Sequence, residues 1–323
     1  MSDGQLRIWV LLGHRTGDNN QLLALAEALK LPFETRTLRF NAFRTVSRWL
    51  GPTLVSLHGA DRSTLRPPWP DLVLGIGWRS VSVARWIKRA SDGRSRLVRI
   101  GNPRANARLF DLVITTPQYP VPDGPNVLRL PLGMSRYRSP PTPSPSETEF
   151  LAGLPRPHHL LAVGGPAKYW RLRPDIVERA ATALAAKGGT TIVATSPRTP
   201  DYVTSALAAH APNEIKLVSG GHPRFAALLG DADEIHVTGD SVAMLSEAVL
   251  SGKPVGIVPI ELDTHGQNVL GRHAETNRDL RRFWASLRDR GLAGTLDHPR
   301  AGQIADPATT AADAIKAVLG DRV

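Results

Sequence analysis

The chain has 323 residues, of which 41% are hydrophobic and none is cysteine. It is therefore long enough for two domains with real cores, and disulfides, thiol catalysis and cysteine metal sites are excluded. The net charge of +11 is uneven, because residues 1–150 carry +10 and residues 151–323 carry +1. The first half is therefore expected to meet an anionic partner, unless its charge serves solubility alone.

The sequence does not suggest a signal peptide or a membrane span. The start, MSDGQLRIWVLLG, has too short an apolar run for a signal peptide, and no segment approaches the roughly 20 apolar residues of a membrane span. We expect a cytoplasmic protein that is at most peripheral on the inner membrane. Aromatic residues make up 6% of the chain, and no nucleic-acid module is recognised, so nucleic acid is not an expected partner.

Strands and helices alternate in the first half. We predict helices at 20–29 and 80–90 and strands at 6–12, 33–38, 71–76, 97–100, 111–115 and 127–130. The segment Arg138–Pro145, RSPPTPSP, is rich in proline and is expected to be extended and stiff. We place an interdomain linker at 141–157.

The second half repeats this alternation. We predict strands at 159–163, 190–195, 214–218, 235–237 and 255–258, and helices at 174–187, 200–209, 223–230, 244–249 and 307–318. Such alternation predicts two α/β domains, each a parallel sheet with helices on both faces, at 1–140 and 158–305. The last helix, in 306–323, is expected to pack back on the first domain. Ligands of such sheets bind beyond the strand ends, so a central cleft is the expected site.

The first candidate loop is Gly13–Gln21, which follows the first strand. His14 and Asp18 are candidate general bases, since each can accept a proton from a hydroxyl group. The loop has neither the Gly-Lys-Ser/Thr ending of a Walker loop nor the dinucleotide GxGxxG pattern. The alternative is a polar loop in which Asp18 or Asn19 caps the helix.

The second candidate loop is Gly164–Arg171, with sequence GGPAKYWR. Gly164 and Gly165 permit close approach of a diphosphate to the backbone. The cationic side chains of Lys168 and Arg171 can neutralise a diphosphate, and Tyr169 or Trp170 can stack on a base or sugar. The alternative is a hinge at the domain border.

Thr238, Gly239 and Ser241 form a small polar turn between a strand and a helix. The free N–H groups and positive dipole of a helix N-terminus favour a phosphate, and Glu247 is placed to reach a ribose beside it. Arg198, after another strand, is a candidate second clamp for phosphate. An ordinary βαβ unit with a capped helix is the alternative.

A last candidate loop, Glu261–Asn268, offers carboxylates and amides that can reach sugar hydroxyls. Asp263 and His265 are possible metal ligands, but two ligands without a helix-spaced partner do not predict a metal site. We therefore predict no metal and no cofactor.

In the basic half, Arg44 and Arg48 alternate with the apolar residues Phe43, Val46, Trp49 and Leu50. A basic amphipathic segment with aromatic residues suits an anionic bilayer surface. A core helix with a solvated arginine face is the alternative.

Three stretches together resemble the signatures of the ELM-type mitochondrial fission family. They are LLGHRTGDNNQLLALAEAL, LAVGGPAKYWRL and TGDSVAMLSEAVLSGKPV, and the likeness runs from about residue 6 to residue 290. The resemblance implies a GT-B architecture, which consists of two Rossmann-like doubly wound domains with the nucleotide-sugar donor in the C-terminal one and the acceptor in the N-terminal one. Its wider relative is the membrane-associated transferase that makes the lipid-linked peptidoglycan precursor.

The resemblance also implies roles for single residues. Glu247 is expected to hold the donor ribose, and Gln267 and Asn268 to meet the donor sugar. Ser241, Met244 and Leu245 are expected near the diphosphate and base. The chain departs from the family at Thr116–Tyr119, where Pro-x-His-Asp is expected, so no acid/base role is assigned there.

These observations predict an inverting, metal-independent glycosyltransferase that uses a nucleoside-diphosphate sugar, most simply a UDP-sugar. Asp18 or His14 deprotonates the acceptor, and helix N-termini after Gly164 and Gly239, with Lys168 and Arg198, stabilise the departing diphosphate. The acceptor is expected at an anionic membrane or on a phosphorylated lipid. The alternatives are a nucleotide-sugar 2-epimerase and a non-catalytic membrane adaptor, because plant members are regarded as recruiters of a fission GTPase.

Overall fold

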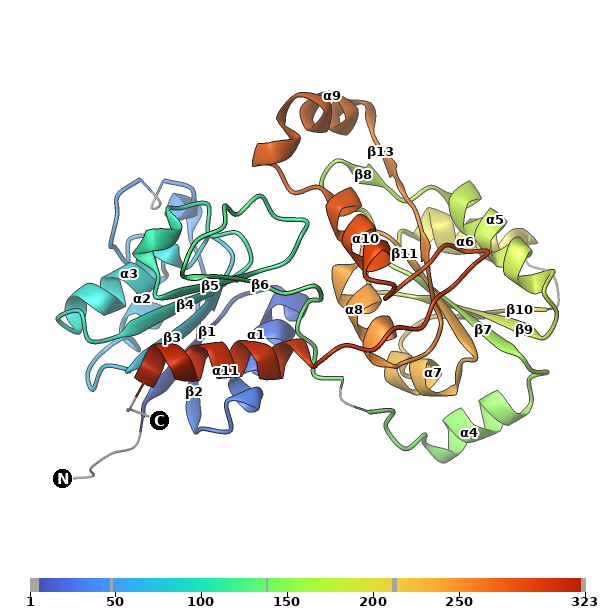
Figure 1. Ribbon diagram of the computed structural model, residues 1–323, viewed down its shortest axis with the longest axis horizontal. Helices are drawn as coiled ribbons and strands as arrows, with labels where there is room; N and C mark the ends of the chain where they lie inside the picture. The colour runs from blue at the N-terminus through green and yellow to red at the C-terminus, as the bar shows by residue number, and fades with distance from the viewer. Residues whose placement is uncertain (1–5, 47–48, 138, 211–213, 321–323) are drawn as a thin grey trace. The chain divides into compact units, whose positions relative to one another are not determined.

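The computed structural model describes residues 6–46, 49–137, 139–210 and 214–320. The chain divides into two compact units (Figure 1). Unit 1 consists of Met1–Arg136 and Ala305–Val323, and unit 2 consists of Tyr137–Ile304. Each unit contains one parallel sheet covered by helices, which confirms the predicted α/β class.

Unit 1 is built on a six-stranded parallel sheet with the order β2-β1-β3-β4-β5-β6. Its strands are β1 (Ile8–Leu12), β2 (Phe33–Thr37), β3 (Leu72–Ile76), β4 (Arg96–Ile100), β5 (Leu112–Thr115) and β6 (Val127–Arg129). Its α-helices are α1 (Thr16–Ala28), α2 (Gly59–Arg62), α3 (Val81–Ala90) and α11 (Pro307–Leu319), and its short 3-10 helices are η1 (Ala42–Arg44) and η2 (Ala107–Leu109).

The strand order of unit 1 reverses between β1 and β3. From β1 the chain crosses to β2 on one side, and it then returns to β3 on the other side of β1. Because such crossovers are right-handed, α1 and α3 cover opposite faces of the sheet. Leu22 and Leu25 of α1 pack with Val10, while Val83 and Ile87 of α3 belong to a separate core.

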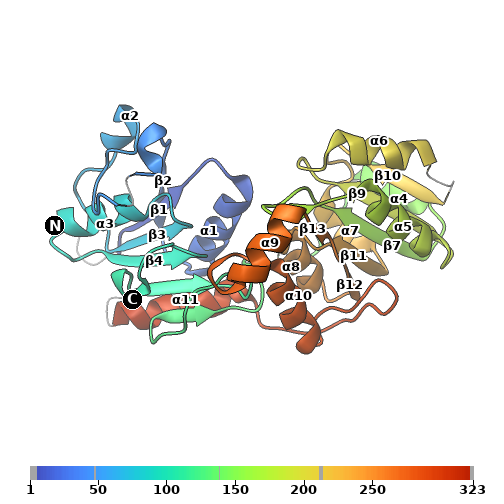
Figure 2. The same cartoon turned by 90° about the horizontal axis from the view of Figure 1, so that it is seen from above.

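Helix α11 completes the core on the α1 face. Its residues Ala308, Ala311, Ala312, Ile315 and Leu319 are buried with those of α1 and the sheet. Figure 1 shows α11, in red, alongside α1, in blue, although the two helices lie at opposite ends of the sequence. Figure 2 shows the same neighbourhood from above.

Unit 2 is built on a five-stranded parallel sheet with the order β10-β9-β7-β11-β12, and a separate antiparallel pair joins β8 and β13. The strands are β7 (His158–Val163), β8 (Trp170–Arg171), β9 (Thr190–Thr195), β10 (Ile215–Val218), β11 (Glu234–Thr238), β12 (Val255–Val258) and β13 (Glu261–Leu262). The helices are α4 (Pro145–Ala152), α5 (Pro174–Ala185), α6 (Asp201–His210), α7 (Phe225–Asp231), α8 (Val242–Leu250), α9 (Thr264–His273), η3 (Ala274–Thr276) and α10 (Leu280–Asp289). The strand order reverses between β7 and β11.

Two predicted irregular segments are helical. Helix α1 begins at Thr16, so residues 16–21 of the predicted loop 13–21 are helical, and Asp18 lies in the first turn. The predicted linker 141–157 contains α4, whose N-terminus has a capping box between Ser144 and Glu147. Proline is accepted at the first position of that helix because its missing N–H group would be unpaired there in any case.

The predicted amphipathic segment around Arg44 forms no long helix within its described residues. A short 3-10 helix ends at Arg44, and the apolar side chains that follow are exposed rather than packed in a core. Trp49 is 76% exposed and Leu50 is 58% exposed. Arg48, like Arg138 at the start of the proline-rich segment, lies outside the described residues.

Two kinds of feature are absent from the described part of the chain. None of its helices is both long enough and apolar enough to cross a lipid bilayer. It also holds no group of three or more His, Asp or Glu side chains with the arrangement of a metal site.

Replacement of Ile315 by alanine tests the role of α11. Ile315 is fully buried in the core of unit 1, so Ile315→Ala should lower the free energy of unfolding by about 2–5 kcal/mol. Urea denaturation followed by circular dichroism measures this change. Asp313→Ala, at an exposed position of the same helix, is the control, and equal stability of the two variants would contradict the packing described.

Candidate functional site

The candidate donor loops of unit 2 meet where its strand order reverses. The loop after β7 and the turn after β11 lie side by side, because these two strands are neighbours. The Gly164 N–H donates to Thr238 Oγ1 at 2.8 Å, and the Gly165 N–H donates to Asp240 Oδ2 at 2.8 Å. Such a reversal point is where open α/β sheets bind ligands.

Asp240 is the centre of this junction. Its side chain is fully buried, and Thr238 Oγ1 donates to its Oδ1 at 2.7 Å. Arg198, from the loop after β9, lies 3.5 Å from the same carboxylate. Burial raises the pKa of Asp240, while the hydrogen bonds from Thr238 and Gly165 oppose that rise. The carboxylate therefore contacts residues at the ends of three strands, β7, β9 and β11.

Gly164 and Gly165 are required by packing. A Cβ at Gly164 would lie 2.0 Å from Asp240 Oδ2, and a Cβ at Gly165 would lie 2.2 Å from the Arg198 carbonyl oxygen. Their N–H groups are also engaged by Thr238 and Asp240. Protein atoms therefore fill the positions that side chains would take at both glycines, and a role of these glycines in binding a diphosphate stays a prediction.

Gly239 is packed in the same way by a tryptophan. Trp284 of α10 donates its indole N–H to the Gly239 carbonyl at 2.9 Å, and a Cβ at Gly239 would lie 2.4 Å from its ring. Trp170 is also buried, and its ring centroid lies 5.1 Å from that of Trp284. Trp170 is therefore a core residue, and the prediction that it stacks on a base or sugar is wrong.

Helix α8 presents its N-terminus beside this junction. Ser241 is its N-cap, and the Ser241 hydroxyl accepts from the Met244 N–H. Leu245 is fully buried, while Met244 and Glu247 are half-buried. Burial raises the pKa of the Tyr137 hydroxyl, and the negative charge of Glu247 raises it further. Glu247 and Tyr137 are therefore neighbours within unit 2.

The second and fourth candidate loops are joined through β8 and β13. The Asp263 N–H donates to the Tyr169 carbonyl at 3.0 Å, and the Tyr169 ring lies 5.4 Å from that of His265. Lys168 is exposed and lies over the Tyr169 ring. Arg171 in β8 is also exposed. The two joined loops therefore bring the rings of Tyr169 and His265 close to the cations Lys168 and Arg171.

Two details of these loops differ from expectation. No helix begins at Gly164, because β8 intervenes and α5 starts only at Pro174. The predicted loop 261–268 is a strand followed by α9, in which Asp263 is the N-cap through its bond from Gly266. Gln267 and Asn268 are exposed in the first turns of that helix.

The candidate bases lie at the strand ends of unit 1. The Asn19 side chain closes the turn before α1, because it accepts from the Gly13 N–H at 2.9 Å and donates to the Gly13 carbonyl at 2.8 Å. His14 is exposed beside this turn, and Asp18 is half-buried. Burial, and then the charges of Arg79 and Arg15, lower the pKa of His14. The neutral imidazole can accept a proton.

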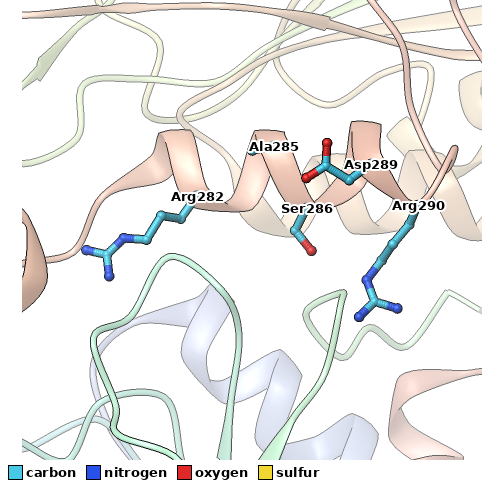
Figure 3. Close-up of a pocket in the computed structure, with 5 residues that line it drawn as sticks. All are labelled: Arg282, Ala285, Ser286, Asp289 and Arg290. Carbon is cyan, nitrogen blue, oxygen red and sulfur yellow. The ribbon is translucent and has the colours of Figure 1, made fainter.

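A surface hollow of about 450 Å³ lies beside α10 and is lined by Arg282, Ala285, Ser286, Asp289 and Arg290. Figure 3 shows that Arg282, Ser286 and Arg290 point from one side of α10 and Asp289 from another. The Arg282 guanidinium donates to the carbonyls of Ala274 and Asn277. The hollow holds none of the predicted donor residues, and one helix lines it, so we assign it no ligand.

Sequence reasoning missed Asp240, Tyr137 and Trp284. Asp240 belongs to the polar turn TGDS, which was predicted as part of a site. No local sequence pattern indicates that its side chain is buried. Trp284 and Tyr137 come from other elements, and their places depend on packing alone.

Replacement of Asp240 by asparagine tests the buried carboxylate. Because the folded pKa is raised, ionisation favours the unfolded chain, and wild type should lose stability as the pH rises above about 4. Asp240→Asn cannot ionise, so its stability relative to wild type should improve from pH 4 to 7. Urea denaturation followed by tryptophan fluorescence measures the difference. Asp289→Asn, at an exposed position on α10, is the control, and a difference that does not vary with pH would refute the assignment.

Known structures resemble this chain over almost all of its length. UDP-GlcNAc 2-epimerase from Neisseria meningitidis, bound to UDP-GlcNAc, is 11% identical with a TM-score of 0.53, and the match covers 97% of this chain and 99% of that one. MurG from Acinetobacter baumannii is 13% identical with a TM-score of 0.50, and the match covers 98% of this chain and 91% of that one. These similarities show a GT-B-like fold.

Similarity in sequence identifies the family. The mitochondrial fission protein ELM1 of Arabidopsis thaliana is 25% identical over 261 residues, which are 72% of this chain. The match spans 58% of the length of that relative. The family described as Mitochondrial fission ELM1 matches residues 16–319. The chain therefore belongs to the mitochondrial fission ELM1 family.

Proposed function

We propose that this protein is an inverting, metal-independent glycosyltransferase that binds a nucleoside-diphosphate sugar, most simply a UDP-sugar, at the strand ends of unit 2. The observation that carries the proposal is the junction of the β7 and β11 loops at the point where the strand order reverses. Open α/β sheets bind nucleotides at such points. The similarity to an epimerase bound to UDP-GlcNAc supports the same class of ligand.

The donor diphosphate would lie over the N-terminus of α8. The dipole of that helix favours an anion at Ser241. Lys168 and Arg198 are exposed beside the junction and supply the positive charge that a departing diphosphate needs. Glu247 would bind the ribose hydroxyls, and Gln267 and Asn268 of α9 would bind the sugar.

The acceptor would bind to unit 1. Asp18, in the first turn of α1, or His14 would remove the proton from the acceptor hydroxyl. The exposed apolar side chains of Phe43, Val46 and Trp49 lie beside Arg44. Such a combination favours an anionic bilayer surface, and it supports an acceptor that is held at a membrane.

Replacement of Glu247 tests the donor site. Glu247→Gln removes the negative charge that binds ribose hydroxyls, so the Kd for UDP should rise about 10- to 100-fold, equivalent to about 1.4–2.8 kcal/mol. Isothermal titration calorimetry measures this constant. Glu149→Gln, at an exposed position of α4, should bind as wild type does. Absence of binding to wild type at millimolar UDP and UDP-sugars, or an unchanged Kd in Glu247→Gln, would exclude the donor site.

A 2-epimerase is the second candidate, because an enzyme of that activity shares the fold. An epimerase converts a UDP-sugar without an acceptor, whereas the proposed transferase should leave UDP-GlcNAc unchanged until a lipid acceptor is added. Incubation with UDP-GlcNAc alone, followed by chromatography of the sugar nucleotides, separates the two activities. A 2-epimer formed without acceptor would replace the transferase proposal. A membrane adaptor, the third candidate, would bind liposomes equally well after Glu247→Gln and Asp18→Asn.

A further inference from the structure

Three adjacent strand ends of unit 1 carry arginines. The loops after β1, β3 and β4 contain Arg15, Arg79 and Arg104 respectively. The strand order reverses between β1 and β3, so Arg15 and Arg79 flank the reversal point of this sheet. The same position in unit 2 holds the proposed donor site. Cations therefore gather where unit 1 is expected to bind a ligand.

Trp78 holds two of these guanidinium groups. The Arg79 guanidinium lies 5.5 Å from the centroid of the Trp78 ring, and the Arg104 guanidinium lies 5.9 Å from it. Arg104 has a φ of 48°, and its N–H donates to Asn102 Oδ1 at 2.8 Å. Cation–π contact with one ring restricts both side chains.

The cluster has more positive than negative charge. The pKa of Arg79 is lowered by burial and then by the charges of Arg15, Arg44 and Arg104, while Asp18 is the acidic group that opposes them. Four guanidinium groups and one carboxylate carry a net charge of +3. Arg79 Nε is buried and has no hydrogen-bond partner among the described residues.

A further guanidinium lies beneath this cluster. Arg99 of β4 is fully buried, and its Nη1 donates to the hydroxyl of Ser80, the N-cap of α3, at 2.7 Å. Burial lowers the pKa of Arg99 to about 9, and no carboxylate of the described residues pairs with it. A cation at a helix N-terminus is repelled by the helix dipole. An anion bound above Ser80 would relieve both effects.

The strand ends are also open. A Cβ at Gly13, Gly17 or Gly77 would meet no atom within 4 Å. His14, Arg15 and Arg104 are exposed, and Arg79 is half-buried. Small residues therefore leave space between the arginines, in contrast to the filled space beside Gly164 and Gly165.

We propose that Arg15, Arg79 and Arg104 bind the diphosphate group of an organic diphosphate at the strand ends of unit 1. A diphosphate carries about two to three negative charges near neutral pH, and its two phosphoryl groups offer more oxygens over a longer span than a monophosphate does. It can therefore reach guanidinium forks from several loops at once. The inference rests on the proposed function only in taking this ligand as the acceptor. Asp18, in the same cluster, would then be the base beside it.

Binding of inorganic pyrophosphate to the full chain tests the site. Titration calorimetry at constant ionic strength should show pyrophosphate binding at least 10-fold more tightly than inorganic phosphate. Arg79→Gln and Arg104→Gln should each weaken pyrophosphate binding at least 10-fold and leave the Kd for UDP at unit 2 within 2-fold of wild type. Arg108→Gln, an exposed position of the same unit, should leave both constants unchanged.

Several outcomes would overturn the inference. They are equal affinity for pyrophosphate and phosphate, equal weakening by Arg108→Gln, and an unchanged Kd in both cluster variants. If Arg79→Gln lowers the melting temperature, the pyrophosphate Kd of the Arg104→Gln variant tests the inference instead, because Arg104 is exposed. If wild type binds pyrophosphate but not UDP, the donor site in unit 2 is refuted and the diphosphate site in unit 1 is not.

Neutral vesicles distinguish the source of the diphosphate. Vesicles of phosphatidylcholine with a small fraction of farnesyl diphosphate should retain wild type in flotation, and Arg79→Gln should not be retained. Free pyrophosphate should release the bound protein. Such release would assign a lipid-linked diphosphate, whereas binding of free pyrophosphate without retention by these vesicles would assign a soluble diphosphate. Equal retention by vesicles that contain phosphatidylserine but no diphosphate would reject the inference in favour of general attraction to anionic lipid.

Discussion

The reversal of strand order in each sheet determines where both candidate sites lie. A right-handed crossover sends successive helices to one face of a parallel sheet until the chain returns to the other side of its first strand. At that return the two neighbouring loops run to opposite faces, and they leave a crevice between them. In unit 1 the crevice lies between β1 and β3, and in unit 2 it lies between β7 and β11. Residues that are far apart in sequence therefore meet there.

The side chains at the two reversal points differ in charge. In unit 2 a buried carboxylate, Asp240, occupies the position between Gly165 and Thr238 and neutralises part of the charge of Arg198. In unit 1 the corresponding position has Asp18 as the acidic group beside Arg79 among the described residues, together with a surplus of arginines. The proposed donor site therefore depends on the α8 N-terminus and the exposed side chains around it, whereas the proposed unit 1 site depends on side-chain cations.

Much of the fold could be predicted because strands and helices have local signatures. The buried runs that form β7 and β9 and the apolar stripe of α5 were placed nearly to the residue. The first turn of α1 was predicted as loop, because TGDNN is polar and resembles a cap region. The α4 helix was missed because proline-rich sequence precedes it, although Pro145 is compatible with a first helical position.

By itself the sequence determined the α/β class, the two parallel sheets, the loops that carry polar chemistry, and the family. These follow from periodicity and short motifs, which act over a few residues. Only the tertiary structure decided that Gly164 and Gly165 pack against Asp240 and Arg198, and that Trp170 is buried against Trp284. It also decided that α11 shares its core with α1. The physical reason is that such contacts join residues distant in the chain, and strand order, which brings them together, leaves no mark on local sequence.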